Sequence, residues 1–171
     1  MLLITSCSRN MTSVTSIPSS DRISSNGCQQ LPFLVIGKVV KGFGRGSKDL
    51  GCPTANISSE VVEQVSLSTG IYCGFAKLYD VIYMMSCSLG YNPQYNNEKK
   101  SLEVHILPDT LEDFYGADLA IAIVAKLRDE KKYPSLSELK FAIQKDNEDA
   151  VQRLTSHEFD SVKEQLESFV S

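Results

Sequence analysis

The chain has 171 residues, of which 42% are hydrophobic and 22% are charged, and its formal net charge is −4. This length allows one domain with a single hydrophobic core, and the composition is ordinary for a globular protein. The acidic balance, with a pI near 5.2, argues against a nucleic-acid-binding domain, because such domains usually carry a basic surface. The sequence also contains no apolar run of the ~20 residues that a membrane-spanning helix needs.

The cysteines and the N-terminal segment bear on the compartment. The five cysteines form no CxxC pair and no zinc-like spacing with His105 and His157, so we expect reduced thiols in a cytoplasmic protein. Residues 1–30 are rich in serine and contain a single acidic residue, Asp21, which predicts a flexible or disordered extension. The same composition also fits an organelle-targeting peptide, and this alternative stays open.

From residue 31 onward the pattern is mainly that of β-strands. The two runs on either side of Tyr79 and Asp80 predict a hairpin, because a two-residue gap between strand-like runs is a hairpin signal. A short helix is expected around Glu60 to Val65. The predicted strands are Phe33–Val40, Gly70–Leu78, Val81–Leu89, Ser101–Leu107 and Leu119–Leu127.

The strand Ser101–Leu107 alternates between apolar and polar residues. Leu102, Val104 and Ile106 fall on one face, and Glu103 and His105 fall on the other. If the aliphatic side chains fill the wall of a barrel, the Glu103 carboxylate faces a cleft. Taken alone, however, a glutamate on a strand is usually a solvated surface charge, and His105 is more often a structural hydrogen-bond donor than a base.

Helices are predicted at the C-terminal end. Ser135, followed by Glu138, forms a capping-box pattern after Pro134. The apolar residues that follow predict one amphipathic helix of about five turns, and a second pattern predicts a shorter helix. Strands followed by helices indicate an α+β, mainly β, barrel-like fold. The first helical stripe comprises Leu136, Leu139, Ile143, Ala150 and Leu154, and the second comprises Phe159, Val162, Leu166 and Phe169.

A glycine-rich and cationic stretch, GKVVKGFGRGSKDLGCPTAN from Gly37 to Asn56, predicts an anion site. Glycines allow the backbone to approach a ligand closely, and the cations supply charge. If the chain is extended after Pro53, Thr54 and Asn56 project to the same face, where a hydroxyl and an amide oxygen suit Mg²⁺. The glycines match neither a Walker A loop nor a dinucleotide fingerprint. Composition alone equally fits a surface turn with solvated cations.

Several separated motifs resemble those of the riboflavin kinase (flavokinase) family. They are GFGRGSKDLGCPTAN, STGIYCGFA, SLGYNPQY followed by SLEVHIL, DFYG, and LRDEKKYPSLSEL. The resemblance implies a closed six-stranded antiparallel Greek-key β-barrel, the riboflavin kinase-like split barrel, with a C-terminal α-helix. It places the kinase domain in residues 31–171, with the barrel to about residue 133 and helices from about residue 135. It also implies a monofunctional ATP:riboflavin 5′-phosphotransferase.

The resemblance further implies roles for particular residues. Glu103 matches the catalytic carboxylate, and Thr54 and Asn56 match the ligands of Mg²⁺, for which Zn²⁺ or Mn²⁺ are alternatives. The nucleotide would contact Gly42, Lys48 and Thr54 at its phosphates and Ile106 and Tyr115 at its other end. The flavin would contact Arg128, Lys131 and Tyr133, since an aromatic ring can stack on isoalloxazine.

Other functions remain compatible with the residues. One is a non-catalytic flavin-binding or carrier protein on the same barrel, and another is a small nucleic-acid-binding barrel that uses GFGRG. Because only about 30 residues precede the barrel, we expect no second nucleotide-binding domain and FMN, not FAD, as the product. We expect a monomer that binds riboflavin or FMN and ATP or ADP, with no nucleic-acid or membrane partner. Tyr91 and Tyr95 fit either a lid or simple loop packing.

Overall fold

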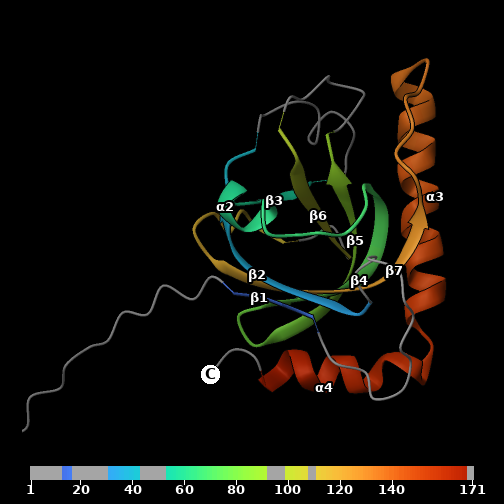
Figure 1. Cartoon of the computed structure of the whole chain (residues 1–171). Helices are drawn as coiled ribbons and strands as arrows, with labels where there is room; N and C mark the ends of the chain where they lie inside the picture. Colours follow the sequence, from blue (N-terminus) through green and yellow to red (C-terminus); the bar gives the residue numbers. More distant parts are fainter. Residues whose placement is uncertain (1–12, 17–30, 43–52, 92–98, 108–110, 169–171) are drawn as a thin grey trace, which may run out of the picture.

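The computed structural model describes residues 13–16, 31–42, 53–91, 99–107 and 111–168. A β-barrel forms the centre, and two C-terminal helices lie against its outside (Figure 1). The strands are β1 (Ser13–Ser16), β2 (Phe33–Val40), β3 (Ala55–Ile57), β4 (Gly70–Leu78), β5 (Val81–Gly90), β6 (Ser101–Leu107) and β7 (Asp118–Arg128). The helices are α2 (Ser59–Val62), α3 (Leu136–Leu154), the 3₁₀ turn η1 (His157–Phe159) and α4 (Asp160–Ser168).

Strands β2 to β7 form a closed barrel of six antiparallel strands. The sheet order is β1-β2-β3-β6-β5-β4-β7, and an additional pairing between β2 and β7 closes it. This closing register runs from Phe33 opposite Ile123 to Lys38 opposite Asp118. Strands β4, β5 and β6 follow one another, and β7 returns to lie beside β4, which is the Greek-key order. The predicted barrel with C-terminal helices is therefore confirmed.

The short strand β1 lies within the segment that the sequence predicts as a flexible or disordered extension. It pairs antiparallel with the Phe33–Ile36 half of β2, whereas β3 pairs with Val39 and Val40 further along the same strand. Thus β2 has β7 on one side and shares its other side between β1 and β3. The rest of residues 1–30 lies outside the described residues, so the boundary at residue 31 stays a prediction.

Apolar side chains pack on both sides of the barrel wall, and β7 shows this most clearly. Leu119, Ile121 and Ile123 belong to the cluster inside the barrel. Ala120 and Ala122 alternate with them and belong to the cluster that contains the helix residues Ala150, Leu154, Val162 and Leu166. Each fully buried Ile or Leu contributes roughly 1.5–3 kcal/mol through burial. The small alanines on the outer face leave room for the helices to approach the wall.

Helix α3 begins at the predicted capping box. The Ser135 hydroxyl oxygen accepts a hydrogen bond from the Glu138 backbone N–H at 3.2 Å, and it donates to Glu138 Oε1 at 3.4 Å. Ala150 and Leu154 are fully buried against the barrel, as the helical spacing predicts. Leu136 was wrongly assigned to this stripe, because its side chain is 58% exposed.

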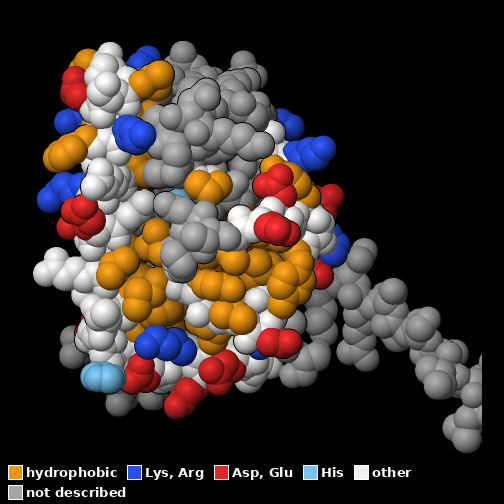
Figure 2. Space-filling view, turned by 180° about the vertical axis from the view of Figure 1, so that it is seen from behind, with side chains coloured by type: hydrophobic (Ala, Val, Ile, Leu, Met, Phe, Trp, Pro, Cys, Tyr) orange, Lys and Arg blue, Asp and Glu red, His pale blue; other side chains and the backbone are white. Residues whose placement is uncertain are grey.

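The molecular surface shown in Figure 2 carries Lys and Arg side chains interspersed with Asp and Glu, around an area of hydrophobic side chains. The mixed signs agree with the modest net charge of −4. Among the helices of the described ranges, none has the length and apolarity needed to cross a bilayer.

Candidate active site

Strand β6 organises the candidate site, because residues that match different roles lie at successive positions along it. Leu102, Val104 and Ile106 are buried in the barrel interior, as the alternating pattern predicts. Glu103 lies on the opposite face and is half-buried. His105 shares that outer face but is only 3% exposed, and its ring Nδ1–H donates to the backbone carbonyl of Pro53 at 2.8 Å. The carboxylate therefore points out of the barrel, away from the aliphatic core.

Glu103 stands beside the residue expected to bind the metal ion. In the pairing of β3 with β6, Asn56 lies directly opposite Glu103, so their side chains share one face. Ala55 and Ile57, on either side of Asn56, are buried in the core, which confirms that Asn56 points outward. The Ser101 hydroxyl donates to Glu103 Oε1 at 3.4 Å. An amide oxygen and a carboxylate are thus neighbours at this point of the wall.

Gly42 lies against the Asn56 side chain. A Cβ atom added at position 42 would stand 2.7 Å from Asn56 Cγ and would overlap its amide nitrogen. Only glycine allows the backbone to lie so close to this amide. The chain just after the end of β2 therefore lies against the Asn56 side chain. Lys48, which the sequence also places at the phosphates, lies outside the described residues.

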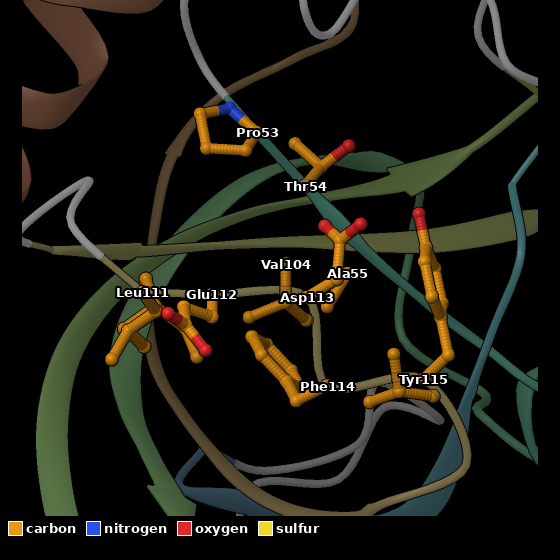
Figure 3. A pocket seen from close by; sticks show the side chains of 11 residues that line it. Pro53, Thr54, Ala55, Val104, Leu111, Glu112, Asp113, Phe114 and Tyr115 are labelled. Carbon is orange, nitrogen blue, oxygen red and sulfur yellow. The ribbon is translucent and has the colours of Figure 1, made fainter.

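A pocket opens beside this row of residues, at one end of the barrel. Its empty space, with the open solvent at its mouth included, is about 460 Å³. Figure 3 shows Thr54 on one side of this pocket and the segment 111–115 on the other. The structure thus brings Thr54, Ile106 and Tyr115 together. The lining residues are Val39, Pro53, Thr54, Ala55, Val104, Ile106, Leu111, Glu112, Asp113, Phe114 and Tyr115.

The acidic residues of this pocket were not assigned a role from the sequence. Glu112 and Asp113 line it together with Tyr115, although only Tyr115 was singled out within the DFYG motif. The available signal was the motif itself, since Asp113 is its first residue. Tyr115 is 51% exposed, and Lys41 Nζ lies 5.9 Å from the centre of its ring. An aromatic side chain with a nearby cation thus stands at the pocket, beside two carboxylates, and its face suits a planar ligand.

Arg128, Lys131 and Tyr133 form a second group beyond the end of β7. The guanidinium carbon of Arg128 lies 5.8 Å from the centre of the Tyr133 ring, and Lys131 Nζ lies 5.7 Å from it. Arg128 also forms an ion pair with Asp146 of α3, at 2.6 Å. Burial alone would lower the pKa of Arg128, but the hydrogen bonds and the charge of Asp146 outweigh it and raise the pKa. The guanidinium is therefore a permanent cation.

The start of β6 connects this second group with Glu103. A Cβ atom at Gly90 would overlap the Glu130 carboxylate, so Glu130 packs against the glycine backbone. Gly90 pairs with Ser101, the first residue of β6, and its carbonyl and Glu103 Oε1, both at 3.4 Å, share the single proton of the Ser101 hydroxyl. With a rise of about 3.4 Å per residue, Ser101 and Ile106 stand roughly 17 Å apart. Along β6, Glu103 therefore lies between Ser101, at the strand end near Glu130, and Ile106, which lines the pocket from the inner face.

The donor set suits a metal ion that already carries phosphate oxygens. No group of three or more His, Cys, Asp or Glu side chains within the described ranges could hold a metal ion by itself. Thr54 and Asn56 instead offer neutral oxygens, and Mg²⁺ in nucleotide sites takes few protein ligands and keeps phosphates and waters. The two residues flank the buried Ala55, so they fit such an ion. Tyr91, the residue after Gly90, is exposed, and Tyr95 lies outside the described residues.

Comparisons with known proteins identify the family of the chain. The family model for flavokinase, riboflavin kinase, matches residues 29–154. The riboflavin kinase of Homo sapiens is 48% identical over 139 residues, which cover 80% of this chain and 90% of that protein. The crystal structure of riboflavin kinase from Trypanosoma brucei has a TM-score of 0.59 and 25% identity, covering 76% of this chain and 81% of that chain.

A second solved structure, described as a macrolide-efflux protein from Streptococcus pneumoniae, has a TM-score of 0.58 and 27% identity. The similar region covers 68% of this chain but 38% of that longer one, so this likeness concerns a part of that protein. The family match spans most of the chain, and the human relative is similar over nearly its whole length. The chain belongs to the riboflavin kinase family.

Proposed function

We propose that this protein is an ATP-dependent riboflavin kinase that transfers the γ-phosphate of ATP to the 5′-hydroxyl of riboflavin, giving FMN and ADP. One observation carries the proposal. Glu103 stands beside Asn56 on the outer face of the barrel wall, on the strand that also supplies Ile106 to the pocket containing Thr54. Phosphoryl transfer needs a carboxylate close to the metal ligand, because the base must lie where donor and acceptor meet.

The nucleotide occupies the pocket at the end of the barrel in this proposal. Ile106 supplies an apolar wall, and Tyr115 offers an aromatic face to the base or sugar. The phosphates extend toward Gly42, whose backbone lies against the Asn56 side chain, and Lys48 adds a cation. Thr54 and Asn56 would hold Mg²⁺, or alternatively Zn²⁺ or Mn²⁺, which neutralises the charge that develops on the phosphate oxygens.

Glu103 handles the acceptor hydroxyl. The 5′-oxygen of riboflavin forms a bond to the γ-phosphorus while the bond between that phosphorus and the ADP oxygen breaks, and the hydroxyl proton passes to the Glu103 carboxylate. Because a carboxylate is a weak base toward an alcohol, its main contribution is to orient the hydroxyl. The hydrogen bond from Ser101 restrains one carboxylate oxygen and helps to fix this orientation. Arg128, Lys131 and Tyr133 hold the flavin ring.

Replacing Glu103 tests the proposal directly. We expect Glu103→Gln to lower kcat by about 10²-fold or more, because the amide cannot accept the proton. Riboflavin and MgATP affinities should change little, since glutamine keeps the size of the side chain. Incubation with riboflavin, ATP and Mg²⁺ followed by chromatographic separation of the flavins measures the rate. Glu164→Gln, on the exposed face of α4, is the matched control. Normal turnover of Glu103→Gln would remove this residue from the mechanism.

We also propose that the protein acts as a cytoplasmic monomer without nucleic-acid or membrane partners, and that residues 31–171 form the kinase domain. The modest net charge and the interspersed surface charges support the absence of a polyanionic partner. Light scattering of the purified chain gives the oligomeric state. Fluorescent tagging at the C-terminus distinguishes a cytoplasmic protein from one that residues 1–30 direct to an organelle.

A further inference from the structure

Asp146 is a buried acidic side chain in the middle of α3. It is 6% exposed, and it belongs to a helix that contributes no residue to the nucleotide pocket. Its two carboxylate oxygens accept hydrogen bonds from Arg128, one from Nε at 2.8 Å and one from Nη2 at 2.6 Å. Such a bidentate pair fixes both the position and the plane of the guanidinium. A buried charge of this kind is costly unless it has this partner.

The contacts of Arg128 leave its guanidinium little freedom. Besides the two bonds to Asp146, its Nη1 donates to the backbone carbonyl of Asp129 at 3.0 Å. Each of the three guanidinium nitrogens therefore has an acceptor. The Tyr133 ring lies 5.8 Å from the guanidinium carbon, so the orientation of the cation also determines what Tyr133 packs against. Asp146 thus acts on Tyr133 through Arg128.

We propose that Asp146 is a positioning residue for the flavin acceptor: it holds Arg128 in the orientation in which Arg128 and Tyr133 together bind the isoalloxazine ring. This inference rests on the proposed function. The inference adds a residue of α3 to a site that otherwise consists of residues from the barrel and its loops. The helix thereby becomes part of riboflavin recognition, and it covers the barrel wall as well.

Contacts other than this ion pair also hold α3 against the barrel. The Ser86 hydroxyl of β5 donates to Asn147 Oδ1 at 2.7 Å, next to Asp146 in the chain. Ala150 and Leu154 are fully buried against the barrel. These contacts should keep the helix in place when the carboxylate is changed. The effect of such a change should therefore fall on Arg128 and the flavin site, and the nucleotide pocket should keep its affinity.

Asp146→Asn tests the proposal, because asparagine keeps the shape but loses the charge and one acceptor. Riboflavin binding is measured by quenching of flavin fluorescence, and MgADP binding by titration calorimetry, so that no turnover intervenes. We expect the riboflavin Kd to rise by at least about tenfold, as misplaced positioning groups typically cause. The MgADP Kd should stay within about twofold of the wild-type value.

The control is Glu148→Gln, on the same helix. Glu148 is exposed and accepts a hydrogen bond from Gln144 at 3.1 Å within α3, so removing its charge should leave both affinities unchanged. If Asp146→Asn does not fold, Asp146→Glu, which keeps the charge but displaces it by one methylene, is measured against the same criterion. Equal losses for both ligands, or an unchanged riboflavin Kd, would overturn the proposal. A wild-type protein that binds no riboflavin would instead refute the proposed function.

Discussion

At Gly42 the backbone lies directly against Asn56, the proposed metal ligand, so a side chain at position 42 would move the Asn56 amide. A methyl group at this position would displace the Asn56 amide, which is the end of a side chain that can rotate. We therefore expect Gly42→Ala to fold with a stability close to wild type and to lose about tenfold or more in kcat/KM for MgATP. Steady-state kinetics at varied Mg²⁺ concentration, combined with urea unfolding, measure both effects.

A double-mutant cycle shows whether Gly42→Ala lowers kcat/KM for MgATP by displacing Asn56. If the alanine at position 42 acts by displacing the amide, adding Gly42→Ala to an Asn56→Ala background should cost little more. Additive losses would show that the two positions act independently. The Asn56→Ala variant also serves as the reference for a site that keeps its backbone but lacks the amide.

His105 links β6, the strand that carries Glu103, to the segment that carries Thr54. Its Nδ1–H donates to the Pro53 carbonyl, 52 residues earlier in the chain, and this bond fixes the backbone just before Thr54. We expect His105→Leu to weaken MgATP binding and to lower the free energy of unfolding by about 0.5–1.5 kcal/mol, because the Pro53 carbonyl loses its donor. His105→Asn should recover part of both, since its amide nitrogen can replace Nδ1. Calorimetric titration measures the MgATP affinity of the two variants, and thermal unfolding measures their stability. Equal losses in His105→Leu and His105→Asn would contradict a role for the hydrogen bond to Pro53.

At the scale of elements, α3 depends on a small set of local contacts at its beginning. The Ser135 cap satisfies one backbone N–H of the first turn, two residues after Tyr133. Ser135→Ala should lower stability by about 1 kcal/mol, which corresponds to a fall in Tm of about 2–4 °C for a chain of this size. The neighbouring Ser137→Ala is the control, because this exposed position makes no cap and alanine favours the helix. Differential scanning calorimetry measures both, and equal Tm values for the two variants would exclude the cap.

Local sequence patterns predicted the longer elements well. The bounds of Phe33–Val40, Gly70–Leu78 and Ser101–Leu107 agree with β2, β4 and β6, because each run is bordered by turn residues or glycine. The hairpin between β4 and β5 is also confirmed, although Tyr79 adopts a positive φ of 54° that favours glycine. The three-residue strand β3 has no pattern of its own. It is a strand because β2 and β6 pair with it on either side.

At the scale of the whole molecule, the contacts that assemble the site are distant in sequence. Periodicity placed Glu103 opposite the core residues of β6, but it could not show that Asn56 lies beside it, because strand pairing is decided by the closure of the barrel. The ion pair of Arg128 with Asp146 likewise joins two elements, a strand end and a helix. The resemblance to a known family supplied the expected roles of Glu103, Asn56 and Arg128, and the fold supplies their neighbours.

Two buried cysteines lie on opposite sides of the barrel wall. Cys87 belongs to the cluster inside the barrel, and Cys73 belongs to the cluster under the helices. Burial raises the pKa of the Cys73 thiol from 9.0 to about 11, although the charge of Arg153 opposes this. Burial also raises the pKa of Cys87, and to a larger extent. Both thiols therefore stay protonated in the folded protein at a pH where the unfolded chain has already ionised them.

This difference predicts a loss of stability in alkali. Above pH 9 the unfolded state binds fewer protons than the folded state, so the free energy of unfolding falls as the pH rises toward 11. The expected loss is about 1 kcal/mol per thiol at pH 10. Because lysines and tyrosines also titrate there, the measurement compares urea unfolding at pH 8 and pH 10 for wild type and a Cys73→Ala, Cys87→Ala variant. The variant should lose less stability than wild type over this interval, and an identical loss in both would show that these thiols ionise without opening the wall.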